Sequence, residues 1–150
     1  MTQATTIRFG RQAILIGDGA TPVEAFAAPC GLTSLTKTTN VETNTVNIPD
    51  CTDPDLSSWL GIDEISRQIQ LSFGGILNVE SLQLWQEWDL AGGYKNVRWF
   101  RDLDLADGGG YLQGPALLTA FEETGEEKQR YQISGTITFD GKPTWTDAAP

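Results

Sequence analysis

The stretch "TSLTKTTNVETNTVN" (residues 33–47) is rich in threonine and valine, which favour β-strands, yet it has no apolar face. Only Leu35, Val41 and Val46 interrupt its polar residues. An isolated ribbon of this kind buries too little apolar surface to offset the entropy lost on ordering. Two interpretations remain open: a solvated surface hairpin, or a ribbon that pairs with something outside its own domain.

The ribbon is followed by "PDCTDPD" (49–55), which carries three aspartates and two prolines. Asp50, Asp53 and Asp55 invite a calcium interpretation, but the prolines stiffen the backbone and no glycine marks the sharp bend of a calcium loop. Aspartate beside proline is common in turns, because aspartate binds nearby amides and proline fixes φ. We expect a stiff acidic turn that ends the extended segment 33–55.

Alternating apolar and polar residues predict antiparallel strands on both sides of the ribbon. In "RYQISGTITF" (130–139) the residues Ile133, Ile137 and Phe139 share one face and are expected in the core. In "EISRQIQLSF" (64–73) the inward residues would be Ile65, Ile69, Leu71 and Phe73. Further strands are predicted at 11–16, 94–101 and 115–123, the last forming a hairpin with the 128–139 strand.

One helix is predicted, over residues 78–91. Asn78 is a suitable N-cap, Glu80 lies in the first turn, and a pair of glycines follows the last turn. Leu82, Trp85 and Trp88 form an apolar stripe at helical spacing, which predicts that this side packs on the sheet as core.

The 150 residues suit a single domain, spanning 1–150, with a frayed tail at 146–150. The fold class expected is mainly β: an antiparallel β-sandwich or barrel with one flanking α-helix and a long β-hairpin extension. Ten Lys and Arg against twenty Asp and Glu give a formal net charge of −10, which disfavours nucleic-acid binding through phosphates.

The absence of histidine excludes Ser-His-Asp and Cys-His catalysis and histidine-ligated metal sites. We therefore expect no enzyme, no cofactor and no metal. The five tryptophans leave one alternative function open, a carbohydrate-binding β-sandwich module that stacks sugars on surface rings.

Two cysteines, Cys30 and Cys51, are too few for a disulfide framework and are expected to be free thiols. The alternative is a bridge, if the ribbon that leaves after Cys30 and returns at Cys51 brings its two ends together. No apolar run approaches the ~20 residues of a membrane helix, so we expect no membrane association and a cytoplasmic location unless the protein is exported.

The order of elements resembles the major tail tube protein of long-tailed, siphovirus-like bacteriophages. The resemblance lies in "APCGLTS" (28–34) before the ribbon, "PDCTDPDLSSWLGIDEIS" (49–66) after it, the helical "LQLWQEW" (82–88), and the closing hairpin at 114–145. It covers the chain from about Ile7 to Trp145.

The resemblance implies a structural subunit that forms hexameric rings, which stack into a hollow tube with an acidic lumen that conducts DNA during ejection. It implies self-assembly in the host cytoplasm, a place in the virion tail, and tape-measure, tail terminator and distal tail proteins as partners. DNA would pass without specific binding. A secretion-system-type tube protein is a variant of the same interpretation.

The same resemblance places the ribbon and the closing hairpin on the inner barrel of the tube. Glu42 is then the expected lumen-facing acid, since its strand segment carries no other acid. A second group of acids clusters at the hairpin turn and is expected at a lumen rim or a ring interface: Glu122, Glu123, Glu126 and Glu127.

Overall fold

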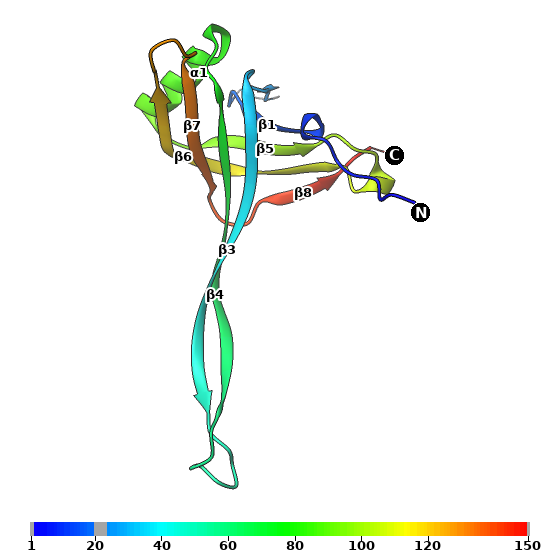
Figure 1. The fold of residues 1–150 in the computed structure, drawn as a ribbon, viewed down its shortest axis with the longest axis vertical. Helices are drawn as coiled ribbons and strands as arrows, with labels where there is room; N and C mark the ends of the chain where they lie inside the picture. Colours follow the sequence, from blue (N-terminus) through cyan, green and yellow to red (C-terminus); the bar gives the residue numbers. More distant parts are fainter. Residues whose placement is uncertain (1, 20–23, 150) are drawn as a thin grey trace.

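The computed structural model describes residues 2–19 and 24–149, and its strands form a single antiparallel sheet (Figure 1). The strands are β1 (Gln12–Gly17), β2 (Phe26–Ala27), β3 (Leu32–Ile48), β4 (Trp59–Ile76), β5 (Lys95–Arg101), β6 (Gly110–Thr124), β7 (Gln132–Phe139) and β8 (Thr144–Asp147). The helices are α1 (Val79–Ala91) and two short 3-10 turns, η1 (Phe9–Arg11) and η2 (Leu105–Asp107). The predicted fold class, mainly β with one flanking helix and a long hairpin extension, is confirmed.

The sheet has eight strands in the order β2-β1-β5-β6-β7-β4-β3, with β8 added beside β6. The long strand β6 joins its two halves, pairing first with β5 and then with β7. A bulge between Leu118 and Ala120 interrupts the register with β7. Bulges bend and twist strands, and β1 and β5 cross the β3-β4-β7 direction steeply in Figure 1. One bent sheet therefore supplies both layers of the sandwich.

The core lies between these two halves and α1. It is built from alternating side chains of the strands and from two tryptophans of the helix: Ile14, Ile16, Val97, Trp99, Leu112, Ala116, Leu71, Phe73, Ile133, Ile137, Phe139, Trp85 and Trp88. Alternation along β7 puts Ile133, Ile137 and Phe139 on this inner side, as its period-two pattern indicates.

Asn78 is the N-cap of helix α1, as its sequence predicts. The Asn78 carboxamide oxygen accepts hydrogen bonds from the Ser81 amide at 2.9 Å and the Ser81 hydroxyl at 2.8 Å. Its inner side carries the fully buried Trp85 and Trp88. Leu82, expected in the same stripe, differs: it is half-buried beside an open groove on the outer side, and Leu84 packs against the core instead.

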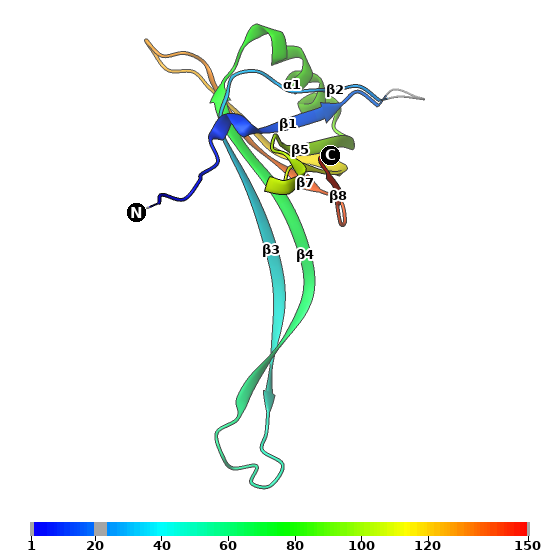
Figure 2. The same ribbon diagram turned by 90° about the vertical axis from the view of Figure 1, so that its right-hand side faces the viewer.

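The hairpin of β3 and β4 is the longest feature of the molecule and projects far from the sandwich (Figures 1 and 2). β7 pairs with β4 only from Gln70 to Ile76, so the rest of the hairpin has no third strand among the described residues. We call residues 39–69, which comprise this two-stranded part and its loop, the arm.

Three sequence-based expectations need correction in this region. The ribbon is one half of a longer hairpin than 33–55, because β3 (Leu32–Ile48) pairs with residues 59–75 of β4 in the same chain. Ile65, expected inward, is 60% exposed because it lies on the arm, beyond the reach of the core. The C-terminal tail is ordered through Asp147, because β8 pairs with β6 and the Ala148 amide donates to the Gly109 carbonyl.

Candidate assembly interface

The four strands β3, β4, β7 and β6 form a sheet with one apolar and one polar face. Residues directly opposite each other in an antiparallel pair share a face, and alternate residues point to opposite faces. The apolar face holds Leu35, Phe73 and Ile137 and covers the core. The other face, here called the polar face, carries Ser34, Thr36, Thr38, Asn40 and Glu42 of β3, Ser66, Gln68, Gln70 and Ser72 of β4, Ser134, Thr136 and Thr138 of β7, and Glu122 of β6.

Hydrogen bonds between side chains confirm that these residues share one surface. Asn40 donates to Gln70 at 3.3 Å, and Gln70 donates to Gln68 at 3.4 Å. The Ser66 hydroxyl donates to the Glu42 carboxylate at 3.3 Å. The polar face thus consists mainly of hydroxyl and amide groups, with Ala120, Ile76 and the half-buried Leu117 as its apolar members.

Charge on the polar face has a single sign. Glu42 and Glu122 belong to it, whereas Lys37 and Arg67, the two cations of the hairpin, alternate onto the opposite face. Lys37 lies over the Trp99 ring at 5.1 Å from its centroid, which holds this cation on the core side. The strands of this face therefore present hydroxyls, amides and carboxylates but no cationic side chain that would neutralise a phosphate.

The four acids of the closing hairpin do not stay together. Glu122 joins Glu42 on the polar face, because it pairs with Ser134. Glu123 points to the other side and accepts a hydrogen bond from the Tyr131 hydroxyl at 2.9 Å, which raises the pKa of Tyr131. Glu126 and Glu127 lie in the exposed turn between β6 and β7. The structure therefore divides the expected rim cluster among the polar face, the opposite face and the turn.

Both edges of this four-stranded sheet are open. β3 is the last strand of the sheet along its whole length, Leu32–Ile48. β6 pairs with β5 only as far as Ala116, so Leu117–Thr124 has a free edge on that side within the described ranges 2–19 and 24–149. Open edges of unpaired amides and carbonyls are ready to accept a strand from another chain.

The far part of the arm carries exposed apolar side chains on both faces. A bulge between Glu42 and Thr43 leaves Ile65 without a partner, and we call residues 43–65 beyond it the distal arm. One of its faces carries Val46, Ile48 and Trp59, and the other carries Leu60 and Ile62. These five side chains are 44–88% exposed. This cluster was not predicted from the sequence, because the strand that follows the acidic turn was assigned to the core. The apolar pair Trp59-Leu60, shortly after that turn, is the signal that could have revealed the cluster.

The tip of the arm is closed by the predicted acidic turn. One Asp50 carboxylate oxygen accepts hydrogen bonds from the Thr52 hydroxyl at 2.6 Å, the Thr52 amide at 2.8 Å and the Asp53 amide at 3.0 Å. These bonds lower the pKa of Asp50, the hydroxyl of Thr52 contributing most. The described residues contain no group of histidine, cysteine and acidic side chains arranged to hold a metal ion.

The two cysteines are free and exposed. Cys30 precedes β3 and Cys51 follows it, and a strand of 17 residues spans roughly 55 Å at about 3.3 Å per residue. Bridging would need Cα atoms within about 7 Å, so the alternative of an internal disulfide is wrong. Trp85, Trp88 and Trp99 are buried in the core, whereas Trp59 on the arm and Trp145 on β8 are exposed.

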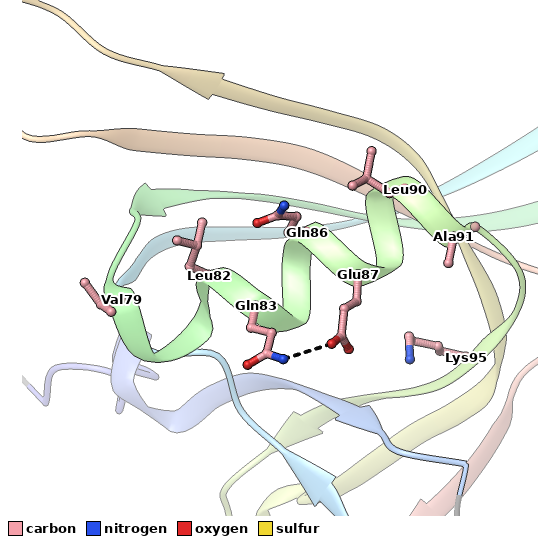
Figure 3. Close-up of a pocket in the computed structure, with 9 residues that line it drawn as sticks. Val79, Leu82, Gln83, Gln86, Glu87, Leu90, Ala91 and Lys95 are labelled. Carbon is pink, nitrogen blue, oxygen red and sulfur yellow. Dashed lines mark hydrogen bonds between the residues drawn. The ribbon is translucent and has the colours of Figure 1, made fainter.

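An apolar groove of about 740 Å³ runs along the outer side of α1 (Figure 3). Val79, Leu82 and Leu90 supply its apolar lining, and Val79 and Leu90 are 87% and 77% exposed. Gln83, hydrogen-bonded to Glu87 at 3.0 Å, and Lys95 form its polar rim. We call this surface the α1 groove. No helix in the described part of the chain is long and apolar enough to cross a membrane.

Comparisons with known proteins agree with this geometry. A family profile described as phage tail tube protein matches residues 9–145. No curated protein sequence matches significantly. Among solved structures, a chain in the virion of a native gene transfer agent particle is similar with a TM-score of 0.74 and 15% identity, covering 94% of this chain and 99% of that one. A chain of the tail of an empty gene transfer agent particle, refined with C6 symmetry, gives 0.73 and 16%, covering 94% and 99%. The SPP1 tail tube gives 0.68 and 9%, covering 97% and 81%.

Proposed function

This chain belongs to the phage tail tube protein family, and from that premise we propose that its copies form hexameric rings that stack into a hollow tube for DNA. The six-fold symmetry of the similar gene transfer agent tail supports the ring size. The role is structural, and the tube is a component of a virion tail that is assembled in the host cytoplasm. Tape-measure, tail terminator and distal tail proteins are the proposed partners at the tube ends.

The observation that carries this proposal is the sheet β3-β4-β7-β6, which is open at both edges and polar on its uncovered face. In a ring, the β3 edge of one copy pairs with the Leu117–Thr124 edge of β6 in the next. Each copy then adds four strands to one continuous barrel, and its polar face turns inward. The apolar face remains covered by the core of its own copy.

The number of strands in the sheet determines whether β3 of one copy and β6 of the next pair in parallel or antiparallel. Successive strands of the sheet alternate in direction, so β3 and β6 at its two edges are antiparallel. Rotation about the tube axis keeps strand directions, so each junction between copies is an antiparallel pair. A barrel of about 24 strands at about 4.8 Å has a circumference of roughly 115 Å, and strand tilt widens it. Such a bore is wide enough for a DNA duplex.

The chemistry of the polar face suits passage of DNA rather than binding. DNA is retained by Lys and Arg that neutralise phosphates, and the polar face carries neither. Glu42 and Glu122 repel phosphates, and the formal net charge of −10 acts in the same direction. The hydroxyls and amides keep the wall hydrated. DNA therefore slides past this wall without specific contacts.

Electron microscopy of concentrated purified protein tests the proposal. Rings or tubes with six-fold symmetry are the expected result. Monodisperse single copies that bind sugars on a glycan array would overturn it and favour the carbohydrate-binding alternative.

A further inference from the structure

We propose that the distal arm of one copy binds the α1 groove of a second copy, with Trp59 as its anchor. This contact rests on the proposed function, because it is the link between one ring and the next. It assigns a receptor to the arm and an occupant to a groove that the fold leaves open.

The distal arm needs a protein partner. The side chains of Val46, Ile48 and Trp59 lie on one face and are 44%, 59% and 88% exposed. The Ile48 side chain lies over Gly61, between Val46 and Trp59, so these groups form one continuous apolar surface. A two-stranded ribbon has no second layer of its own to cover it. Apolar surfaces of this kind mark protein contacts.

The polarity of this face changes at the bulge. Before it, Thr38, Asn40 and Glu42 belong to the polar face. Beyond it, the same side of β3 carries Val46 and Ile48. Bulges redirect a strand where its surroundings change. In the proposed tube, the hairpin therefore leaves the hydrated wall of the bore after Glu42, and its distal arm forms an apolar contact with another chain.

The α1 groove offers the complementary surface. Trp85 and Trp88 bury the inner side of α1, yet Val79 and Leu90 on the outer side are almost fully exposed. Exposed valine and leucine side chains that line one groove, beside the polar Gln83 and Gln86, are typical of a protein contact, so we expect this groove to be covered. In Figure 3 the apolar side chains of the groove follow the helix axis, as a slot for an extended segment requires.

The rim of the α1 groove carries one charge of each sign, Lys95 and the Glu87 carboxylate that accepts a hydrogen bond from Gln83. Lys95 has no ion pair within residues 2–19 and 24–149. Trp59, Gly61 and Asp63 are alternate residues of β4 and therefore lie on the same face of the arm. We expect Asp63 to pair with Lys95 when Trp59 occupies the groove, and Asn44, on the same face of the arm, to bond to Gln83 or Gln86. An aromatic anchor with a polar rim is the usual arrangement of an interface hot spot.

The positions of the two surfaces set the symmetry of the contact. The arm tip and α1 lie at opposite ends of the long axis (Figure 1). One copy therefore cannot fill its own groove with its own distal arm. Two different patches that bind head to tail generate an open-ended stack when the operation does not close. A stack of rings is such an assembly.

Cross-linking of assembled tubes tests the contact. Both native cysteines are replaced (Cys30→Ser, Cys51→Ser), and Ser58→Cys beside the anchor is combined with Gln86→Cys in the groove. A short bismaleimide should then give a ladder that extends beyond dimers on a denaturing gel, because each copy links to one copy ahead and one behind. Either cysteine alone should give no ladder. The control pair Ser58→Cys with Thr138→Cys, on the polar face, should give none.

Substitution of the contacts gives the second measurement. Trp59→Ser and Leu90→Asp should each raise the protein concentration needed for tubes at least about tenfold, whereas Asp89→Ala, on α1 outside the groove, should not. Circular dichroism and melting of the single copies check that both variants fold. Tubes of the Ser58→Cys/Gln86→Cys variant that give no ladder, or Trp59→Ser and Leu90→Asp variants that stack normally, would overturn this contact alone. A wild-type chain that never forms tubes would overturn the proposed function with it.

Discussion

The ring of Phe73 on β4 stacks against the indole of Trp85 on α1, with centroids 4.6 Å apart and planes inclined by 18°. Trp85 also stacks with Phe121 of β6 at 5.6 Å and is fully buried. This cluster ties the helix to the base of the projecting hairpin and to the strand that joins the two halves of the sheet.

Replacement of Trp85 by alanine should therefore destabilise the single copy by roughly 3–5 kcal/mol, as large-to-small core changes do. Urea denaturation of the wild type and the variant measures the difference. A surface substitution on the same helix, Glu80→Ala, is the matched control and should change the free energy of unfolding by less than about 0.5 kcal/mol. A loss below about 1 kcal/mol for Trp85→Ala would contradict the packing of α1 described above.

The arm should exchange its amide hydrogens rapidly in the single copy and slowly in the tube. Its pairing from Thr39 to Ile48 has no third strand, and isolated two-stranded ribbons are marginally stable in water. Hydrogen exchange read by mass spectrometry on both states checks this. The β4 segment 70–75, which pairs with β3 on one side and β7 on the other, provides the internal control. Equally strong protection of the arm in both states would contradict an ordering of the arm on assembly.

The tip of the arm should loosen at low pH. Hydrogen bonds from Thr52 and Asp53 lower the pKa of Asp50 in the folded turn. A folded pKa below the unfolded value stabilises the turn above the unfolded pKa, and this stabilisation is lost as pH falls through the folded value. Thr52→Val should raise the pKa of Asp50 towards its ordinary value, measured by the NMR titration of its carboxyl carbon. An unchanged titration would show that the hydroxyl does not hold this carboxylate.

Much of the fold could be predicted from local patterns. Alternation located β1, β5 and β7, and the Asn78 cap with its following glycines located α1. Each of these strands, like the helix, buries one of its faces, so the pattern that identifies it lies within its own stretch of sequence. The pairing of the ribbon with Trp59–Ile76 could not be predicted, because both strands of the arm are exposed and neither shows a buried face.

The candidate site was predicted only in part. Glu42 was proposed as a lumen residue from its isolation among threonine and asparagine, and the register places it on the polar face. Glu122 and Glu123 lie on opposite faces because successive strand residues alternate, but the bulge at Leu118/Ala120 decides that Glu122 is the one on the polar face, and no sequence pattern indicates this bulge. Leu82 was misplaced because a helix with tryptophans inside and leucines outside has two apolar sides.

Reversal of charge at Glu42 should convert a passive wall into a DNA-binding one. Glu42→Lys places one cation per copy on the polar face, and each cation that neutralises a phosphate makes binding salt-dependent. Tubes should still assemble, sediment with short DNA duplexes at low salt, and release them at higher salt. Glu80→Lys on α1, away from the polar face, is the matched control and should bind no duplex inside the tube. Glu42→Lys tubes that ignore DNA at low salt would show that Glu42 faces elsewhere.

Helical reconstruction of tubes formed by the purified protein tests the central claim most directly. We predict six copies per ring and an inner barrel built from β3, β4, β7 and β6, with antiparallel junctions between the β3 edge and Leu117–Thr124 of the next copy. Glu42 and Glu122 should point into the bore. A bore lined by α1 or by the apolar face of this sheet, or junctions that leave the β3 edge unpaired, would contradict the account.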